Sequence, residues 1–334
     1  MKIFGIGNPL LDVQAHVTFE FLKEFGLDPD AQILAKTKTH AALFDAIKMK
    51  PGVTFVPGGS TQNALRVAQW VLTAAGIDKA TTFAGCVGED TTADIMRSEL
   101  ERAGVQCLYQ TTTLLDTGVC AVCIVGHGRS LVASLGASEK FSASFLIENF
   151  QIWQSHEIFY NEGFFITVSP ESISLVSKYA EEAGKIYATN ISSRFIAETQ
   201  MFRDVLMENI DRTDILFGNE TEAHALAKGL GWSLSLTDIA CKLSMMPKRV
   251  GWRPRIIVLT RGASETVIAE GGRIDLVPTV QVPQEEIRDT NGAGDAYVGG
   301  FLAGVAQKLD TRQCCYLGAY AASVVIRRIG CTTC

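Results

Sequence analysis

The feature that most constrains the fold is a repeated alternation of short apolar runs with helix-length segments. Runs typical of buried strands occupy residues 2–6, 81–87, 157–160, 185–190, 215–218, 255–260 and 266–269. Helical spacing of apolar residues occurs at 61–75, 90–103, 172–183, 220–230 and 236–243, in a long stretch from 294, and at 312–327. Strands joined by helices form parallel sheets that helices cover on both faces. The sequence therefore predicts an α/β fold with a mainly parallel sheet.

Two segments interrupt this alternation. Residues 113–136 have the pattern of a hairpin, with apolar runs at 118–125 and 130–135 around a turn at Gly126-His127-Gly128. Residues 13–57 look irregular, apart from a strand-like stretch at 32–35 and a helix near 40–49. We interpret these segments as a small inserted α+β lid over residues 13–58 and 113–136. The large α/β domain then comprises residues 1–12, 59–112 and 137–334.

Charge and hydropathy exclude several classes of protein. The formal net charge is -6, from 36 acidic and 30 basic residues, so the chain offers no general attraction for nucleic acid. Its longest apolar runs, such as residues 119–125, fall well short of the ~20 residues that span a bilayer. The N-terminus reaches Asn8-Pro9 before the apolar region of a signal peptide could form. We expect a cytoplasmic protein, with a nuclear location also compatible, and neither nucleic acid nor membrane as partner.

The nine cysteines support the same compartment, because they are scattered and form no disulfide framework. Two Cys-x-x-Cys pairs occur, Cys120/Cys123 and Cys331/Cys334. The first pair lies in a predicted strand, where positions three apart point to opposite faces and cannot share one metal ion without distortion. We therefore do not expect zinc.

The strongest candidate for chemistry is the segment 289–300, Asp-Thr-Asn-Gly-Ala-Gly-Asp-Ala-Tyr-Val-Gly-Gly. Gly292-Ala293-Gly294 leads into helix-forming residues, and unpaired N–H groups at a helix N-terminus bind anions. Asp295 lies beside this site, where a carboxylate can accept the proton of an attacking hydroxyl. An acid next to an anion site indicates a group transfer, whereas a helix cap followed by small-residue packing is the alternative.

Three further segments carry candidate ligands. Gly58–Asn63 opens the first long helix, either as a close approach to a ligand or as an ordinary Gly-rich loop with a Ser cap. Asp12 follows the first strand, where ligands bind in open parallel sheets, and can accept hydrogen bonds from two adjacent hydroxyls. Glu222 could hold Mg²⁺ through water, or could simply favour the N-terminus of its helix. Neither a dinucleotide fingerprint nor a Walker A motif is present.

Together these segments resemble the ribokinase (PfkB carbohydrate kinase) family, and within it the members that phosphorylate adenosine. Residues 289–300 match the family's C-terminal signature, and residues 8–12, 58–70, 163–172, 214–222 and 320–328 match in the expected order. The resemblance covers essentially the whole chain. It implies a ribokinase-like three-layer α/β/α large domain with a lid, and transfer of the ATP γ-phosphoryl group to the 5′-hydroxyl of adenosine. It also implies Mg²⁺ as cofactor and, with the lid acting as a cover, a monomer.

The resemblance also assigns roles to individual residues. Asp295 would be the general base, and Asn291, Gly292, Ala293 and Gly294 would form the anion hole. Asp12, Gly59 and Asn63 would hold the ribose, with Asn8 and Ser60 near the sugar and purine. Phe164 would stack on adenine, and Gln32, Leu34, Cys120, Leu131 and Ala133 of the lid would wall the pocket. Arg129 would reach the phosphates on closure, Asn219 and Glu222 would position Mg²⁺, and Thr260 and Gly262 would lie along ATP.

Two other functions remain open at this point. A sugar kinase of the same family is one, although an apolar base pocket argues against it because a free pentose needs polar partners for its hydroxyls. A catalytically silent nucleotide-binding protein is the other. The intact Asp295 argues against it, because binding alone needs no base there.

Overall fold

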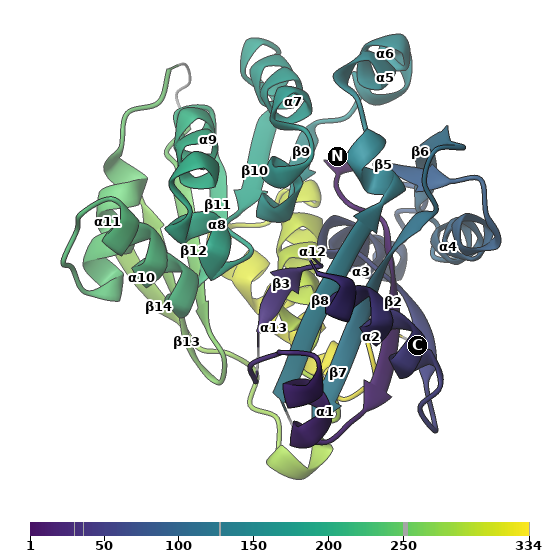
Figure 1. Ribbon diagram of the computed structural model, residues 1–334. Helices are drawn as coiled ribbons and strands as arrows, with labels where there is room; N and C mark the ends of the chain where they lie inside the picture. The colour runs from purple at the N-terminus through teal and green to yellow at the C-terminus, as the bar shows by residue number, and fades with distance from the viewer. Residues whose placement is uncertain (30, 36, 127, 250–252, 334) are drawn as a thin grey trace.

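The computed structural model describes residues 1–29, 31–35, 37–126, 128–249 and 253–333, and it contains two sheets (Figure 1). The large sheet has the strand order β14-β13-β12-β11-β10-β9-β1-β5-β6. All neighbours from β12 to β6 pair in parallel, and β13 and β14 are added in antiparallel orientation. The strands are β1 (Ile3–Ile6), β5 (Thr81–Gly88), β6 (Gln106–Thr112), β9 (Ile158–Asn161), β10 (Ile186–Asn190), β11 (Ile215–Asn219), β12 (Ile256–Arg261), β13 (Ser264–Glu270) and β14 (Arg273–Val277).

Helices cover both faces of the large sheet. One face packs against α3 (Ser60–Ala74), α4 (Thr91–Arg102), α12 (Ala293–Ala306) and α13 (Thr311–Val325). The other face packs against α5 (Ala143–Glu148), α6 (Phe150–Trp153), α7 (Pro170–Glu182), α8 (Arg194–Glu198), α9 (Gln200–Ile210), α10 (Glu220–Gly229) and α11 (Leu236–Met245). The helix η2 (Gly163–Thr167) directly follows β9 and contributes to this second core. The predicted three-layer α/β/α architecture is therefore confirmed.

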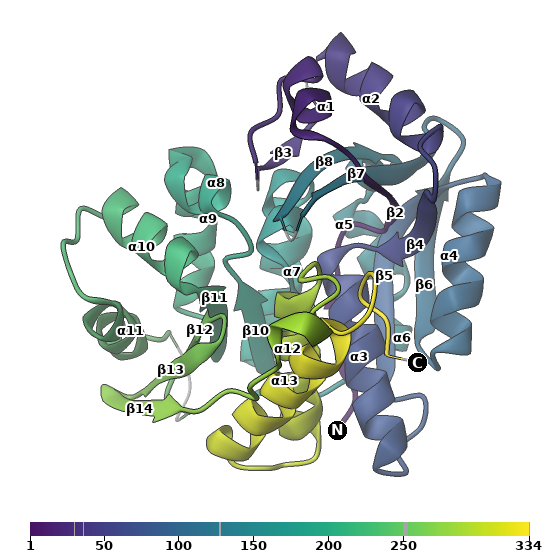
Figure 2. The same ribbon diagram turned by 90° about the horizontal axis from the view of Figure 1, so that it is seen from below.

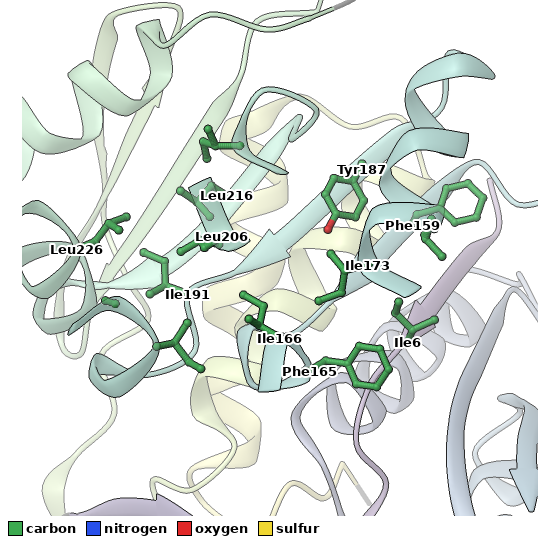
Figure 3. Packing of buried hydrophobic residues seen from close by; sticks show 14 of the residues in the cluster. Ile6, Phe159, Phe165, Ile166, Ile173, Tyr187, Ile191, Leu206, Leu216 and Leu226 are labelled. Atoms are coloured by element: carbon green, nitrogen blue, oxygen red, sulfur yellow. The ribbon is translucent and has the colours of Figure 1, made fainter. Parts of the chain in front are cut away.

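The second core shows why these residues form a layered fold. Phe159 and Leu216 are fully buried on their strands, and Phe165, from η2, packs in the same cluster (Figure 3). Ile173 of α7 and Leu226 of α10 close the cluster from the helical side. Burying each such side chain stabilises the fold by about 1.5–3 kcal/mol. The strands are thus held as a rigid platform, and their ends can position polar groups.

The small sheet has the order β3-β8-β7-β2-β4, and α1 (Phe19–Glu24) and α2 (Lys38–Lys48) lie on one side of it (Figure 2). Its strands are β2 (Leu10–His16), β3 (Gln32–Leu34), β4 (Thr54–Gly58), β7 (Thr117–Val125) and β8 (Gly128–Gly136). Cys123 packs in the core under the helices, whereas Cys120, three residues earlier, packs on the opposite face with Leu131 and Ala133. This is the alternation expected for a strand. Cys334, the partner in the second pair, lies outside the described residues.

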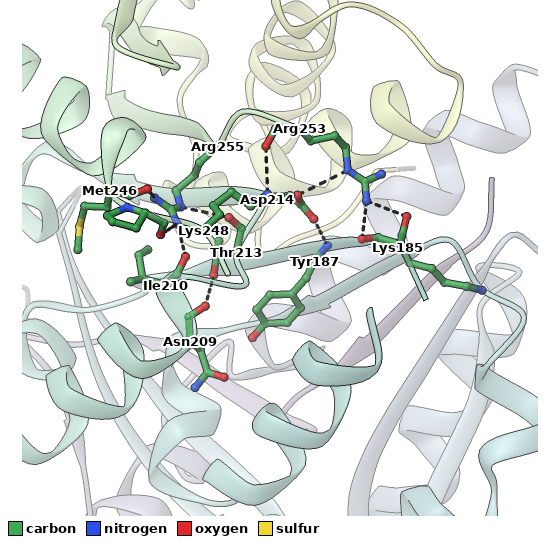
Figure 4. Close-up of polar contacts among 12 residues, drawn as sticks. Lys185, Tyr187, Asn209, Ile210, Thr213, Asp214, Met246, Lys248, Arg253 and Arg255 are labelled. Atoms are coloured by element: carbon green, nitrogen blue, oxygen red, sulfur yellow. Dashed lines mark hydrogen bonds and ion pairs between the residues drawn. The ribbon is translucent and has the colours of Figure 1, made fainter. Parts of the chain in front are cut away.

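A polar network supports the amino-terminal ends of β10, β11 and β12 (Figure 4). The Asp214 carboxylate accepts a hydrogen bond from the Tyr187 amide at 2.9 Å and pairs with Lys248. The buried Arg255 donates to the carbonyl oxygens of Thr213, at 3.1 Å, and Ile210, at 2.6 Å. These contacts satisfy buried charges at the amino-terminal ends of the strands. The site lies at the opposite, carboxyl ends of the strands.

Some local predictions were wrong. Residues 13–57 are not irregular, because β2 and β4 pair with each other and complete the small sheet. Asp12 accordingly lies within β2 rather than at the end of the first strand. The strands β6 and β14 and the helices α5, α6, α8 and α9 were not anticipated. The predicted turn at 126–128 joins β7 to β8 as expected, although His127 is outside the described residues.

Among the residues that the structure describes, none of the helices has the length and apolar character needed to cross a bilayer.

Candidate active site

A cavity of about 420 Å³ lies where the carboxyl ends of the parallel strands meet the small sheet. Residues at or just past the ends of β1, β9, β10, β11 and β12 line it, as expected for an open α/β sheet. Of the predicted site residues, the structure brings the following together around this cavity: Asn8, Asp12, Gln32, Leu34, Gly59, Ser60, Asn63, Cys120, Arg129, Leu131, Ala133, Phe164, Asn219, Glu222, Thr260, Asn291, Gly292, Gly294 and Asp295.

The start of α12 forms an open helix N-terminus. Its N-cap, Gly292, has φ +74°, a left-handed conformation that favours glycine, and no side chain caps the helix. Among the described residues, no protein group accepts a hydrogen bond from the N–H groups of Gly294 or Asp295. A Cβ atom built on Gly294 would meet nothing within 4 Å. These N–H groups are therefore accessible to an anion in the cavity.

Asp295 lies within the first turn of α12, and two side chains of α3 hold its carboxylate. The Ser60 hydroxyl donates to Oδ1 at 2.6 Å, and the Asn63 amide nitrogen donates to Oδ2 at 3.0 Å. Burial raises the pKa of Asp295, and these two hydrogen bonds oppose that rise. Ser60 and Asn63 were predicted to approach the nucleoside. In this structure they also orient the predicted base, which gives Asp295 a fixed direction.

Asp12 lies in the small sheet, next to the start of α3. A Cβ atom on Gly58 would come within 2.4 Å of the Asp12 carboxylate, and one on Gly59 within 2.2 Å of the Asn8 carbonyl oxygen. Neighbouring protein atoms therefore leave no room for a side chain at either position. Burial raises the pKa of Asp12 to about 8, with Asp295 and Asp289 adding to the rise. A hydroxyl donor that enters the cavity would favour the ionised form of Asp12, in which both carboxylate oxygens can accept a hydrogen bond.

Arg129, at the start of β8, is buried rather than solvated. Its Nε donates to Asp289 Oδ1 at 2.8 Å, and Nη2 donates to the carbonyl oxygen of Arg288 at 3.3 Å. The Asp289 carboxylate also accepts hydrogen bonds from the amides of Asn291, at 2.7 Å, and Gly330, at 2.8 Å. This arginine therefore connects the small sheet to the loop that precedes the open end of α12.

Asn219 and Glu222 form a capping box at the start of α10. The Glu222 amide donates to Asn219 Oδ1 at 2.9 Å, and the Glu222 carboxylate accepts from the amide and side chain of Asn219 at 3.0 and 2.8 Å. Burial raises the pKa of Glu222 to about 7. Carboxylate and amide oxygens suit Mg²⁺, which keeps several waters and uses few protein ligands. The pair fits a metal ion held through water better than one bound directly by several side chains.

Apolar side chains form one wall of the cavity. Phe164, from η2, packs against Phe195 of α8, with ring centroids 5.9 Å apart and a tilt of 39°. Apolar residues of the small sheet face the same cavity and include Leu10, Ile33, Leu34, Leu131, Ala133 and Leu135. The cavity therefore has an anion-binding end at α12 and an apolar region that suits a flat aromatic group.

Sequence reasoning missed other residues that line this cavity, namely Leu10, Ile33, Leu135, Glu162, Thr167, Asn190, Ser192, Phe195, Phe217, Gly218, Thr290, Tyr297 and Val298. The ends of the predicted strands at 157–160, 185–190 and 215–218 were the available signal for Glu162, Asn190 and Gly218. Ala293 and Gly262 are not among the lining residues. The roles assigned to the site residues, lining or not, stay predictions.

Comparison with known proteins places this fold and site in a family. The chain matches the model of the pfkB family carbohydrate kinases over residues 32–334. Adenosine kinase 2 of Arabidopsis thaliana is 40% identical over 333 residues, which cover 99% of this chain and 95% of the relative. Adenosine kinase of Dictyostelium discoideum is 37% identical, with 99% and 96% covered. The chain therefore belongs to the pfkB family of carbohydrate kinases.

Solved structures of similar proteins agree. The crystal structure of Anopheles gambiae adenosine kinase in complex with P1,P4-di(adenosine-5) tetraphosphate has a TM-score of 0.94 and 38% identity, covering 98% of this chain and 96% of that chain. Adenosine kinase from Schistosoma mansoni in complex with adenosine and AMP has a TM-score of 0.90 and 25% identity, covering 99% and 96%. Among the members of the pfkB family, this chain is thus similar to adenosine kinases.

Proposed function

We propose that this chain transfers the γ-phosphoryl group of ATP to the 5′-hydroxyl of adenosine, giving AMP and ADP. The observation that carries this conclusion is the placement of a half-buried, oriented carboxylate, Asp295, beside the open N-terminus of α12. Such a pair can hold a transferring phosphoryl group and accept the proton of the attacking alcohol. The curated relatives and solved structures described above carry the same activity in their names.

The polar groups of the cavity suit a ribose. The side-chain amide of Asn8 is buried, and neither of its polar atoms has a partner among the described residues. The Oδ1 atom of Asn63 is likewise buried without a partner in the described part of the chain. Buried polar atoms without partners cost free energy, and hydroxyl groups of a ligand would satisfy them. With the Asp12 carboxylate as a further acceptor, these atoms would hold the sugar with its 5′-hydroxyl toward Asp295.

Catalysis would rest on alignment and on neutralisation of charge. The Asp295 carboxylate would accept the proton as the 5′-oxygen attacks the γ-phosphorus, while the N–H groups of Gly294 and Asp295 stabilise the charge on the phosphoryl oxygens. Arg129 would add positive charge at the same end of the cavity. Asn219 and Glu222 would hold Mg²⁺ through water, and the ion would neutralise charge on the polyphosphate. Thr260 would lie along the phosphates of ATP.

The small sheet would act as a lid. Its apolar residues face the cavity, so a bound nucleoside would be enclosed between them and Phe164. Exclusion of water matters because water would otherwise take the phosphoryl group. We assign residues 13–58 and 113–136 to this lid, with β2 entering it from Leu10. As a cover made by the same chain, the lid is compatible with a monomeric enzyme.

A coupled assay of ADP release tests the proposal. Release should require adenosine, should be far slower with free ribose, and should be at least ~10²-fold slower in Asp295→Asn. The apolar wall favours this outcome over a sugar kinase, because a pentose leaves that region unfilled. Equal rates with ribose would identify a sugar kinase, and no release with any nucleoside or sugar would identify a binding protein.

A further inference from the structure

A buried carboxylate that the proposed mechanism does not use lies beside the nucleoside side of the cavity. Glu162 directly follows β9, is 1% exposed, and lines the cavity. Its Oε1 accepts a hydrogen bond from the Asn8 amide at 3.0 Å, and its Oε2 accepts one from the Thr61 amide. Both acceptor oxygens are thus engaged by backbone donors from two separate segments.

These bonds belong to a closed set that joins three elements. The Glu162 amide donates to Thr61 Oγ1 at 3.1 Å, and the Thr61 hydroxyl donates to the carbonyl oxygen of Ile6, also at 3.1 Å. The set therefore ties the end of β9 to the end of β1 and to the first turn of α3. Gly7 fits inside it, because a Cβ atom there would lie 2.7 Å from Thr61 and 3.2 Å from Glu162.

Each backbone segment that Glu162 holds presents a polar group to the cavity. Asn8 presents its side-chain amide, whose two polar atoms have no partner in the described part of the chain. Thr61 follows Ser60, whose hydroxyl donates to Asp295. The two segments also meet directly, since a Cβ atom on Gly59 would lie 2.2 Å from the Asn8 carbonyl oxygen. A shift of either segment would therefore displace groups that face the nucleoside.

A carboxylate suits this place better than an amide. Two N–H donors require two acceptor oxygens, which only an ionised carboxylate provides, since glutamine presents one oxygen and one NH₂ group. The negative charge also lies at the N-terminus of α3, where the helix dipole favours it. The N-cap of α3, Gly59, has no side chain to provide such a cap.

We propose that Glu162 is a positioning residue that sets the affinity for the nucleoside, by holding the backbone at Asn8 and Thr61 so that the Asn8 amide meets the substrate. The inference rests on the proposed function. In this proposal Glu162 does not contact the phosphates, and it affects the binding of adenosine but not the binding of ATP. Its effect is transmitted through Asn8, so the two residues act as a unit.

The test compares the Michaelis constants of both substrates in the purified protein. Glu162→Gln should raise KM for adenosine by ~10-fold and leave KM for ATP within about twofold. Glu157→Gln is the matched control. Glu157 lies just before the start of β9, and its carboxylate accepts a hydrogen bond from the Lys2 amide at 2.6 Å. The Glu157→Gln variant therefore changes a similar hydrogen bond that lies outside the cavity lining. The control should leave both constants unchanged.

A double-mutant cycle separates positioning from general destabilisation. In an Asn8→Ala background, Glu162→Gln should raise KM for adenosine by less than about twofold, because the side-chain amide that Glu162 positions is already gone although the backbone N–H remains. Should Glu162→Gln fail to fold, Glu162→Asp keeps the charge and should give a smaller rise in the same constant. Equal rises for adenosine and ATP, an unchanged adenosine KM, or additive effects in the cycle would overturn the inference. Lack of activity in the native protein with every nucleoside would instead refute the proposed function, and this inference with it.

Discussion

Two helices begin at the same cavity with a glycine of positive φ, and they treat their N-termini in opposite ways. At α12 the cap is Gly292, and the N–H groups of Gly294 and Asp295 have no acceptor among the described residues. At α3 the cap is Gly59, but the carboxylate of Glu162 accepts the N–H group of Thr61. One end is open for an anion, whereas the other is already filled by one.

We expect this difference to orient the substrates. A phosphate group is attracted to the open end of α12 and is repelled from the start of α3, where a carboxylate already lies. A third helix at the cavity, α10, is closed by its own capping box. The uncharged nucleoside would therefore be directed to the α3 side and the polyphosphate to the α12 side. The N-termini of these two helices would thus separate the two substrates.

The largest expected effect concerns the acid at the open end. Asp295→Asn should lower kcat by at least ~10²-fold, because the 5′-hydroxyl loses its proton acceptor. Adenosine affinity, measured by calorimetry, should stay within a few-fold of native. Turnover close to native would show that another group accepts the proton. The open end of α12 would then not be the place where the proton is accepted.

On the nucleoside side, Asp12→Ala should weaken adenosine binding by about 10-fold or more, since each charge-assisted hydrogen bond contributes about 1.5–3 kcal/mol. ATP binding should change little. The native protein should also use 2′-deoxyadenosine poorly, because one of the two hydroxyl donors is missing. Calorimetry with both ligands checks the first expectation and steady-state rates check the second. Equal losses for the two ligands would indicate a folding defect instead.

The comparison can be reversed by filling the open helix end. A Cβ atom on Gly294 meets no protein atom within 4 Å, so Gly294→Asp and Gly294→Asn should both fold. The aspartate would imitate Glu162 and repel phosphate, so its kcat/KM for ATP should be ~10-fold below that of the asparagine variant. The asparagine variant controls for size. Identical values for the two would show that charge at this helix end does not select the phosphate.

Arg129 should contribute less than the residues above, because it acts beside the open end of α12 rather than within it. Arg129→Ala should lower kcat by ~10-fold, and Arg129→Lys should restore part of the loss, since lysine lacks the planar fork of arginine. Adenosine affinity should be unchanged. Native turnover in Arg129→Ala would show that this arginine does not contribute to catalysis and that its role is the structural ion pair with Asp289.

The smallest effect is on stability without ligand. Burial raises the pKa of Asp12 from 3.8 to about 8, so the folded protein holds this proton more tightly than the unfolded chain. The stabilising contribution is complete below about pH 4 and is lost as the pH rises to about 8. The melting temperature of the native protein should therefore fall across this range, and Asp12→Asn should reduce the slope. An equal slope in both proteins would assign the effect to other carboxylates.

The sequence predicts much of the fold because repeated strand and helix periods are local signals. It predicts the open end of α12 for the same reason, since residues 289–300 are contiguous. Glu162 could not be found in this way. It is a single acid after a strand, and its partners Asn8 and Thr61 lie far away in the chain and offer only backbone atoms. The strand β6 was missed because Gln106, Gln110 and the threonines that follow interrupt an apolar pattern.

The small sheet is assembled from pieces of chain that lie far apart in the sequence. Residue 10 of β2 lies beside residue 118 of β7. Between them the chain forms strands β5 and β6 of the large sheet and helices α3 and α4, which pack on that sheet. Closing such a long loop costs entropy before the new contacts repay it. We therefore expect β2 to pair with β7 late, because the elements formed between them shorten the flexible loop that this pairing must close. The pairing of β2 with β7 would then be among the last contacts to form in this part of the chain.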